Sequence, residues 1–308
     1  MHASACVTGF HTRSPMKILL FGANGQVGWE LQRALAPLGT LTALGHGDGD
    51  LEKPLRPILD REAPDVIVNA AAYTAVDRAE SEPERAQRIN GDAVGEMAQA
   101  AAESGALLVH YSTDYVFDGK GTAPYREGDA TAPLNTYGRT KLAGETAIRA
   151  SGCRHAIFRT SWVYAARGKN FARTILERAK TLESLKVVAD TWGVPTSAEL
   201  LADVAALAIH RDAGRFPSGT YHLVPSGETT WHGYAAVLLE TARACGVPLR
   251  VAPDAILPVA ASAFPAPAAR PLNSRLDNTR IQETFGLQLP DWRVHVRRFV
   301  EEIAGSIH

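Results

Sequence analysis

Short apolar runs alternate with amphipathic stretches in the first half of the chain. The apolar runs have the length of buried strands and lie at 17–21, 41–44, 66–69, 107–111 and 156–160. Helical patterns are expected between them, at 26–36, 55–63, 82–104 and 136–150. Continuously apolar strands that alternate with helices are typical of a parallel sheet covered by helices on both faces. The pattern predicts an α/β fold with a Rossmann-type, doubly wound parallel sheet.

The alternation becomes less regular in the second half. Helical patterns recur at 170–182, 197–211, 230–245 and 291–303, and short strands are expected near 186–189, 220–224 and 249–251. The stretch 252–271 is rich in alanine and proline, so we interpret it as an ordered loop, with a flexible linker as the alternative. A chain of 308 residues exceeds the usual size of one core. We expect a dinucleotide-binding domain over 16–165 and a mainly substrate-binding, smaller α/β domain over 166–308, with some segments returning to the first.

A glycine-rich turn, Gly-Ala-Asn-Gly-Gln-Val-Gly at 22–28, follows the first expected strand and opens the first expected helix. Glycine there permits a tight turn, close approach of backbone to a pyrophosphate, and close packing of helix on strand. The helix N-terminus adds free N–H groups and a positive dipole end. A turn without a ligand is the alternative, but the position favours a nucleotide. Gly22, Gly25 and Gly28 are therefore candidate cofactor-binding residues.

The second expected strand lacks an acidic residue at its end. A dinucleotide site usually places Asp or Glu there, on the adenosine ribose hydroxyls. Here the strand ends in Gly45-His46, and Asp48 and Asp50 follow in a glycine-rich loop. The sequence therefore does not favour strict NADH selectivity.

Tyr137 and Lys141 lie four residues apart in an expected helix. Residues at this spacing share one helix face, so both side chains can point into one cleft. A nearby cation favours the ionised phenol, so we expect Lys141 to lower the pKa of Tyr137. Such a phenol can donate a proton to a carbonyl oxygen while hydride reaches the carbon. An exposed helix face is the structural alternative for this spacing.

Polar residues also follow the strand expected at 107–111. Thr113 and Asp114 lie where that strand ends, and ligands bind at the carboxyl ends of strands in open parallel sheets. A helix cap or turn would use the same residue types. Together with Tyr137 and Lys141, however, we favour a catalytic role for Thr113.

Composition and charge exclude several classes of function. The formal net charge is −1 and the sequence pI is about 6.8, so no overall positive field favours nucleic acid. The three cysteines form no disulfide or zinc pattern. No apolar run approaches the roughly 20 residues of a membrane span. Residues 1–15 make a poor signal peptide, so we expect either a disordered extension or a mis-set start codon, and a cytoplasmic protein.

Several segments together resemble one family, the dTDP-4-dehydrorhamnose reductases of the extended short-chain dehydrogenase/reductase superfamily. The resemblance runs from Met16 nearly to the C-terminus. It is carried by the segments FGANGQVGWELQRAL, VIVNAAAYTAVDRAESEPE, HYSTDYVFDG, PLNTYGRTKLAGE, FRTSWVYA, WGVPTSAELLAD and RPLNSRL.

The resemblance implies reduction of the C4 ketone of dTDP-4-dehydro-L-rhamnose by NADPH or NADH, in the synthesis of a bacterial surface polysaccharide precursor. It implies that Tyr137 donates the proton, that Lys141 tunes the phenol and binds the nicotinamide ribose, and that Thr113 assists at the carbonyl. The implied cofactor contacts are Gly25, Gln26, Val27, Asp50, Leu51, Ala72, Tyr73 and Thr74. Trp162, with Asp114, would contact the sugar, although a tryptophan in the core is the alternative.

Three further expectations concern the substrate diphosphate, a metal and a partner. Arg270 and Arg275 are candidates for the diphosphate because guanidinium groups match phosphate geometry, although they could equally form a solvated face. The family resemblance implies a homodimer, in some members held by magnesium, and the matching acidic positions are Glu30, Glu199 and Glu302. Relatives often carry Asp at the position of Gly45, so NADPH is at least as strongly indicated as NADH.

Two other functions share the fold. A nucleotide-sugar dehydratase or epimerase is the first, and dehydratases typically carry Asp-Glu after the threonine, whereas Tyr115 follows Asp114 here. A non-catalytic regulatory subunit is the second, and such proteins can lose the catalytic residues that this chain retains. The sequence therefore favours the reductase.

Overall fold

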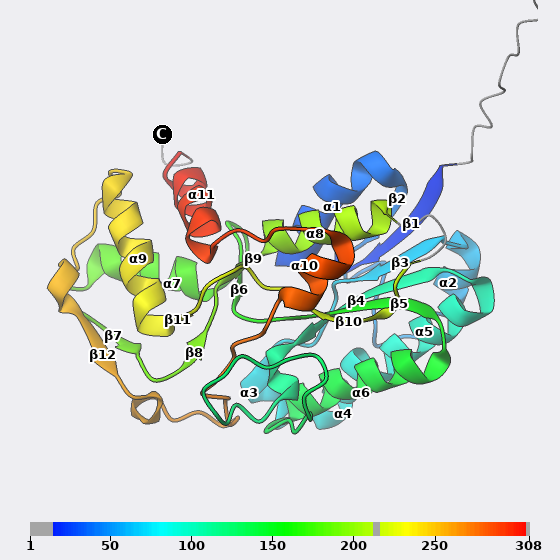
Figure 1. Cartoon of the computed structure of the whole chain (residues 1–308), viewed down its shortest axis with the longest axis horizontal. Helices are drawn as coiled ribbons and strands as arrows, with labels where there is room; N and C mark the ends of the chain where they lie inside the picture. Colours follow the sequence, from blue (N-terminus) through cyan, green and yellow to red (C-terminus); the bar gives the residue numbers. More distant parts are fainter. Residues whose placement is uncertain (1–14, 212–215, 306–308) are drawn as a thin grey trace, which may run out of the picture.

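A computed structural model describes residues 15–211 and 216–305, and a six-stranded parallel sheet forms its larger part (Figure 1). The strand order is β10-β5-β4-β3-β1-β2. The strands are β1 (Met16–Phe21), β2 (Gly39–Leu44), β3 (Val66–Asn69), β4 (Leu107–Thr113), β5 (Arg154–Thr160) and β10 (Gly219–His222). The order reverses between β1 and β3, and ligands bind at such a switch point.

Helices cover both faces of the sheet, as the apolar strands predict. One face packs against α1 (Gln26–Leu35), α8 (Ala198–His210) and α10 (Thr279–Phe285). The other packs against α2 (Arg56–Glu62), α5 (Ala93–Ser104) and α6 (Thr136–Ser151). Alternate strand residues supply the two cores, since Ile18 and Leu20 belong to the first and Leu19 and Phe21 to the second. The doubly wound fold is confirmed.

The remaining elements form a smaller α/β unit beside the carboxyl ends of the strands (Figure 1). Its core lies among α7 (Phe171–Thr181), α9 (Trp231–Ala244) and α11 (Trp292–Gly305), with the parallel pair β7 (Leu185–Val188) and β12 (Ile256–Val259). Short strands join it to the sheet region: β6 (Val163–Tyr164), β8 (Trp192–Gly193), β9 (Thr196–Ser197) and β11 (Thr229–Thr230). None of the helices in the described residues is long and apolar enough to cross a membrane.

Other short elements complete the chain. They are α3 (Val76–Ala79), α4 (Pro83–Gln87), a π-helical turn η2 (Arg88–Asp92), and the 3₁₀ turns η1 (Ala36–Leu38), η3 (Asp114–Val116), η4 (Pro253–Ala255) and η5 (Ala261–Ala263).

Two predictions for the second half are wrong. Residues 249–251 form no strand, and β12 instead lies inside the proline-rich stretch, which is neither a pure loop nor a linker. Pro258 is tolerated because β12 belongs to a sheet of only two strands, where one edge needs no N–H donor. Of the expected extension at 1–15, all but Pro15 lies outside the described residues.

Candidate active site

A cavity of about 880 Å³ lies at the carboxyl ends of β1, β3, β4 and β5 and reaches the smaller unit. Neighbouring strand ends are level there, because Phe21 pairs with Asn69 and Thr113 pairs with Thr160. Nearly all the residues expected at the site line this cavity: Gly22, Gly25, Gln26, Val27, Asp50, Leu51, Ala72, Tyr73, Thr74, Thr113, Asp114, Tyr137, Lys141 and Trp162. Gly28 is the exception among the cofactor residues and lies beneath the turn.

The glycine-rich turn leaves no room for side chains at two positions. Gly22 has φ +85°, and a Cβ there would lie 2.6 Å from the backbone nitrogen of Ala71. A Cβ on Gly28 would lie 1.9 Å from the oxygen of Gly22, so α1 packs directly on the turn. No side chain caps α1, whose N-cap is Gly25. The open N–H groups of this helix therefore face the cavity as an anion site.

The amide side chain of Asn24 lies beside the end of β2, where dinucleotide sites usually have an acidic residue. A Cβ on Gly45 would lie 2.5 Å from Nδ2 of Asn24, so the Asn24 side chain occupies the space beside that strand end. Both residues line the cavity, as does His46. The site thus presents no carboxylate at this position to repel a 2′-phosphate.

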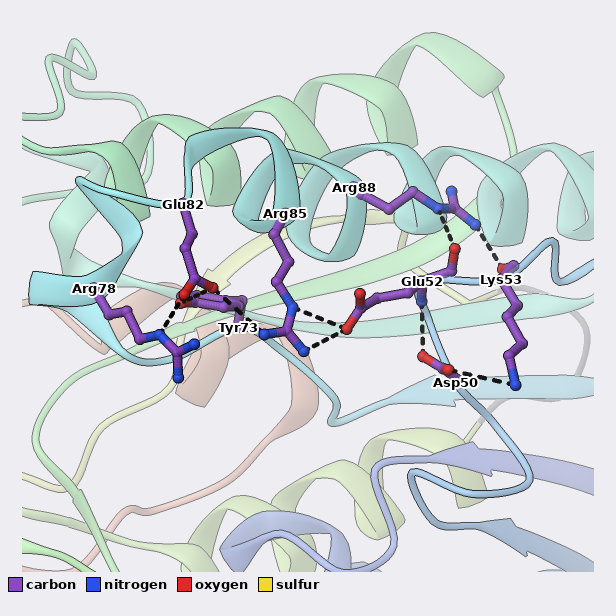
Figure 2. Close-up of polar contacts among 8 residues, drawn as sticks. All are labelled: Asp50, Glu52, Lys53, Tyr73, Arg78, Glu82, Arg85 and Arg88. Carbon is purple, nitrogen blue, oxygen red and sulfur yellow. Dashed lines mark hydrogen bonds and ion pairs between the residues drawn. The ribbon is translucent and has the colours of Figure 1, made fainter.

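A network of ion pairs and hydrogen bonds holds the loop that carries the expected adenine contacts. Figure 2 shows its members: Asp50, Glu52, Lys53, Tyr73, Arg78, Glu82, Arg85 and Arg88. Arg85 donates to the Glu52 carboxylate at 2.9 and 2.6 Å and pairs with Glu82 at 3.4 Å, while the Tyr73 hydroxyl donates to Glu82 at 2.9 Å. Arg88 donates to the backbone oxygens of residues 52 and 53 at 3.3 and 2.6 Å. The polar loop is therefore fixed against α4 and η2.

Tyr137 lies in the first turn of α6, whose N-terminus is capped by Asn135. Asn135 accepts a hydrogen bond from the N–H of Gly138 at 2.8 Å, which starts α6 beside Thr113. Burial raises the pKa of Tyr137 to about 12, a hydrogen bond with Thr113 opposes this rise, and Asp114 adds to it. The pKa of Tyr137 is thus raised and not lowered as expected, because burial is the largest effect on it and Lys141 is not among its causes.

Lys141 is almost fully buried, with 2% of its surface exposed. Its Nζ donates to the backbone oxygen of Tyr111 at 2.7 Å and lies 3.2 Å from Nε2 of His110. Burial lowers the pKa of Lys141 to about 8, against an opposing effect of Glu145. The amine can therefore exchange a proton near neutral pH.

Trp162 lines the cavity in a strained conformation. Its φ is +49°, a region that bulky residues rarely adopt. Its ring stacks on Trp231 with centroids 3.7 Å apart, and a Cβ on Gly193 would lie 2.7 Å from the opposite part of the ring. Strain of this kind persists where surrounding packing enforces it, and it is enriched at ligand sites. Trp162 is not a core residue.

Sequence reasoning missed two cavity residues from the smaller unit, Trp231 and Lys169. Neither lies in a recognisable motif, and only their place in the fold brings them to the site. Lys169 is exposed and follows Gly168, whose loop is joined to the nucleotide turn by a 2.8 Å hydrogen bond from Asn170 to Gln26. This loop brings a cation to the cavity rim.

The two candidate diphosphate arginines lie elsewhere. Arg270 pairs with Asp77 at 2.7 Å, and Arg275 pairs with Glu228 at 3.4 Å while lying over the ring of Trp192. Neither lines the cavity. Arg270 nevertheless approaches the site, because its side chain also hydrogen-bonds Tyr115, which lines the cavity.

The three candidate metal ligands are not arranged for a metal. Within residues 15–211 and 216–305, no group of three or more His, Cys, Asp or Glu could hold an ion. Glu30 pairs with Arg33 at 3.5 Å and Glu199 with Arg298 at 2.6 Å. Glu199 and Glu302 both lie close enough to raise the pKa of Glu30, although burial is the main cause of that rise. Arginines thus supply the counter-charge that magnesium was expected to supply.

Comparisons with known proteins agree with this site. The chain matches the family model described as RmlD substrate binding domain over residues 16–304. It is 55% identical over 296 residues to the dTDP-4-dehydrorhamnose reductase of Escherichia coli (strain K12), covering 94% of this chain and 98% of that protein. The spore coat polysaccharide biosynthesis protein SpsK of Bacillus subtilis (strain 168) is 38% identical, covering 93% and 97%.

A solved structure is similar over the same length. It is the dTDP-4-dehydrorhamnose reductase of Bacillus anthracis str. Ames in complex with NADP, with a TM-score of 0.86 and 33% identity. The match covers 93% of this chain and 99% of that chain. The whole described chain, and not only the sheet, therefore resembles these proteins.

Proposed function

The chain belongs to the family described as RmlD substrate binding domain, with dTDP-4-dehydrorhamnose reductases among its relatives. From this membership we propose that the chain reduces the C4 ketone of dTDP-4-dehydro-L-rhamnose to dTDP-L-rhamnose, with NADPH or NADH as the reductant. One observation supports this most: Tyr137, Thr113 and Lys141 line one cavity between the glycine-rich turn and Trp162. The phenol of Tyr137, the hydroxyl of Thr113 and the amine of Lys141 thus lie between the proposed nucleotide site and the ring of Trp162.

The residues present fit a nicotinamide dinucleotide. The glycine-rich turn and the uncapped start of α1 suit a pyrophosphate. Asp50 and Leu51, on the braced loop, would bind the adenine, and residues 72–74 would line the cofactor. The bound nicotinamide supplies the hydride. Because no carboxylate stands at Gly45, NADPH and NADH are both expected to bind.

Tyr137 donates its proton to the ketone oxygen as the carbonyl carbon is reduced. Thr113 hydrogen-bonds Tyr137 and is placed to bind the same oxygen, which orients the carbonyl toward the phenol. A phenol with a pKa of about 12 is protonated at neutral pH, so it carries the proton that the reduction requires. Trp162 would pack against the deoxyhexose ring, and Lys169 would approach the substrate diphosphate.

No particular residue supports either a nucleotide-sugar dehydratase or epimerase, or a non-catalytic regulatory subunit. Asp114 is followed by Tyr115, whose ring packs edge-on against Tyr137 at 5.6 Å, so the second acid of a dehydratase is replaced by an aromatic wall. A regulatory subunit would not need Thr113, Tyr137 and Lys141 in one cavity.

We further propose that the chain forms a homodimer without magnesium. Family resemblance supports the dimer, and the pairing of Glu30 and Glu199 with arginines removes the need for a metal. Light scattering with and without EDTA tests this proposal. The same dimer mass is expected in both samples, and dissociation by EDTA would contradict it.

Absorbance of NADPH tests the proposed activity. The ketosugar nucleotide is generated from dTDP-glucose in the same reaction, and the product is identified by mass spectrometry. We expect NADPH consumption only when the ketosugar is present, with a gain of two mass units in the nucleotide sugar. A chain that binds NADPH without consuming it would instead be a regulatory subunit.

A further inference from the structure

A buried hydrogen-bond chain runs behind the cavity, inside the sheet. Nδ2 of Asn69, at the end of β3, lies 3.1 Å from Nδ1 of His110 in β4, and Nε2 of His110 lies 3.2 Å from Nζ of Lys141. Asn69 is 1% exposed and His110 is fully buried. Nothing in the cofactor or substrate contacts above requires a histidine at this place.

Hydrogen-bond accounting determines which protons this chain carries. Oδ1 of Asn69 accepts from the N–H of Ala71 at 3.0 Å, which fixes the amide so that its NH₂ faces His110. Nδ1 of His110 must then accept, because two donors cannot face each other. A neutral imidazole that accepts at Nδ1 carries its proton on Nε2. Nε2–H therefore points at the Lys141 nitrogen.

An N–H that points at Lys141 can be accepted only by a neutral amine, since an ammonium has no lone pair. Burial makes a cationic His110 unfavourable and holds its pKa well below the usual range, with a further effect of Lys141. Burial likewise lowers the pKa of Lys141, to about 8. Geometry and desolvation thus both destabilise the ammonium, which still predominates at pH 7 with a pKa of about 8.

We propose that Asn69 and His110 are positioning residues that act through Lys141: by presenting Nε2–H to its nitrogen, they favour the neutral amine and make the ammonium a ready proton donor. After Tyr137 has given its proton to the ketone, the phenolate takes one proton from the Lys141 ammonium, directly or through a bound hydroxyl. The products are the neutral phenol and the neutral amine. Water then returns a proton to the amine.

The other charged groups around Lys141 do not replace this effect. Glu145, on the same helix, acts on Lys141 directly, whereas Asp114 acts on Tyr137 and Arg159 acts on Glu145. Glu145 favours the ammonium, but its carboxylate already accepts from Arg159 at 2.8 and 2.7 Å and from Ser112 at 2.7 Å. His110 is thus the group that contacts Nζ and favours its neutral form.

Long-range ¹H–¹⁵N spectra of the cofactor-free protein test the tautomer directly, whether or not the chain reduces any sugar. The signals of His110, assigned by their loss in His110→Phe, should show the Nε2–H form from pH 6 to 8. In Asn69→Asp, the new carboxylate should accept from His110 and move the proton to Nδ1. An Nδ1–H or cationic ring in the unmodified protein would overturn the proposal.

The pH dependence of kcat/KM provides the second test, which rests on the proposed reduction. We expect activity to fall above about pH 8 in the unmodified enzyme, as Lys141 loses its proton. Asn69→Asp should raise this limit by about one pH unit or more, which is a tenfold change in proton affinity. His110→Phe, which adds no charge, should raise it in the same direction.

His155→Phe is the matched control, because His155 lies in β5 with Nδ1 on the oxygen of Cys153 and does not line the cavity. Its alkaline limit should equal that of the unmodified enzyme. If Asn69→Asp and His110→Phe fold and bind NADPH but keep the original limit, the pair is merely structural. If the chain reduces no ketosugar but shows the Nε2–H tautomer, the proposed function fails and the protonation state stands.

Discussion

The two sides of the cavity are built in different ways. The nucleotide side comes from successive strand–helix units, and its shape is set by backbone, as the contact of Gly28 with the oxygen of Gly22 shows. The substrate side comes from side chains far apart in sequence, with Trp162 held between Gly193 and Trp231. Backbone geometry is encoded locally, whereas packed side chains depend on the whole fold. Substitutions on one side should therefore change cofactor binding and substitutions on the other should change substrate binding. Replacing Tyr137, which lies where the two sides meet, should change kcat and neither binding step.

Replacing the phenol at the junction should have the largest effect. Tyr137→Phe removes the proton donor and should lower kcat by roughly 10²–10⁴, the usual contribution of a positioned general acid. NADPH affinity, measured by fluorescence titration, should barely change, because the hydroxyl mainly serves the transition state.

Tyr125→Phe is the control, since the Tyr125 hydroxyl bonds Asp118 at 2.7 Å and does not line the cavity. It should retain nearly all activity. A Tyr137→Phe enzyme with a kcat close to that of the unmodified protein would remove this tyrosine from the reaction.

Cofactor selectivity tests the nucleotide side alone. NADPH and NADH should both support turnover, with kcat/KM values within about 100-fold of each other. Gly45→Asp should shift the preference toward NADH by repelling the 2′-phosphate. Because the Asn24 amide fills the space beside Gly45, the shift should be larger in the double variant with Asn24→Ala. Equal preference in all three proteins would show that this strand end does not contact the ribose.

Trp231→Ala tests the substrate side alone. Loss of the stacked ring removes the support of Trp162 and should raise the KM for the ketosugar by about tenfold, in line with roughly 0.5–1.5 kcal/mol for an aromatic pair plus lost packing. NADPH affinity should stay the same. A matching loss of NADPH affinity would mean that the two sides are not independent.

The smallest effect is expected for the two arginines outside the cavity. Arg270 and its partner Asp77 are 43% and 44% exposed, and such pairs contribute about 0–1 kcal/mol. Arg270→Ala and Arg275→Ala should therefore change kcat/KM by less than about tenfold, whereas Lys169→Ala should raise KM more. A greater loss for either arginine would restore its assignment to the diphosphate.

The sequence predicted the sheet region well because its signals are local. Each signal involves only residues of one strand–helix unit: the continuous apolar strands, the GxxGxxG spacing and the spacing of Tyr137 and Lys141. The expected helix at 82–104 is present as α4, η2 and α5, interrupted only by a π-helical turn. Most candidate cofactor residues consequently line the cavity.

The sequence did not predict features that depend on burial or on distant contacts. The raised pKa of Tyr137 comes mainly from burial, which spacing alone cannot reveal. The pairing of Arg270 with Asp77 joins residues 193 positions apart, so the sequence could not reveal this ion pair. Nor does any motif mark Trp231. Burial and contacts between distant residues thus determine the substrate side more than they determine the nucleotide side.

The most direct test compares kcat/KM for the dTDP-linked ketosugar with that for the free 4-keto-6-deoxyhexose, at saturating NADPH. If the cavity binds a nucleotide sugar beside the cofactor, contacts with the remote nucleotide help to orient the ketone for Tyr137. Charged contacts of this kind contribute about 1.5–3 kcal/mol each, so we expect the free sugar to be poorer by roughly a thousandfold. Equal efficiency for the two ketones would contradict the account and leave only a general carbonyl reductase.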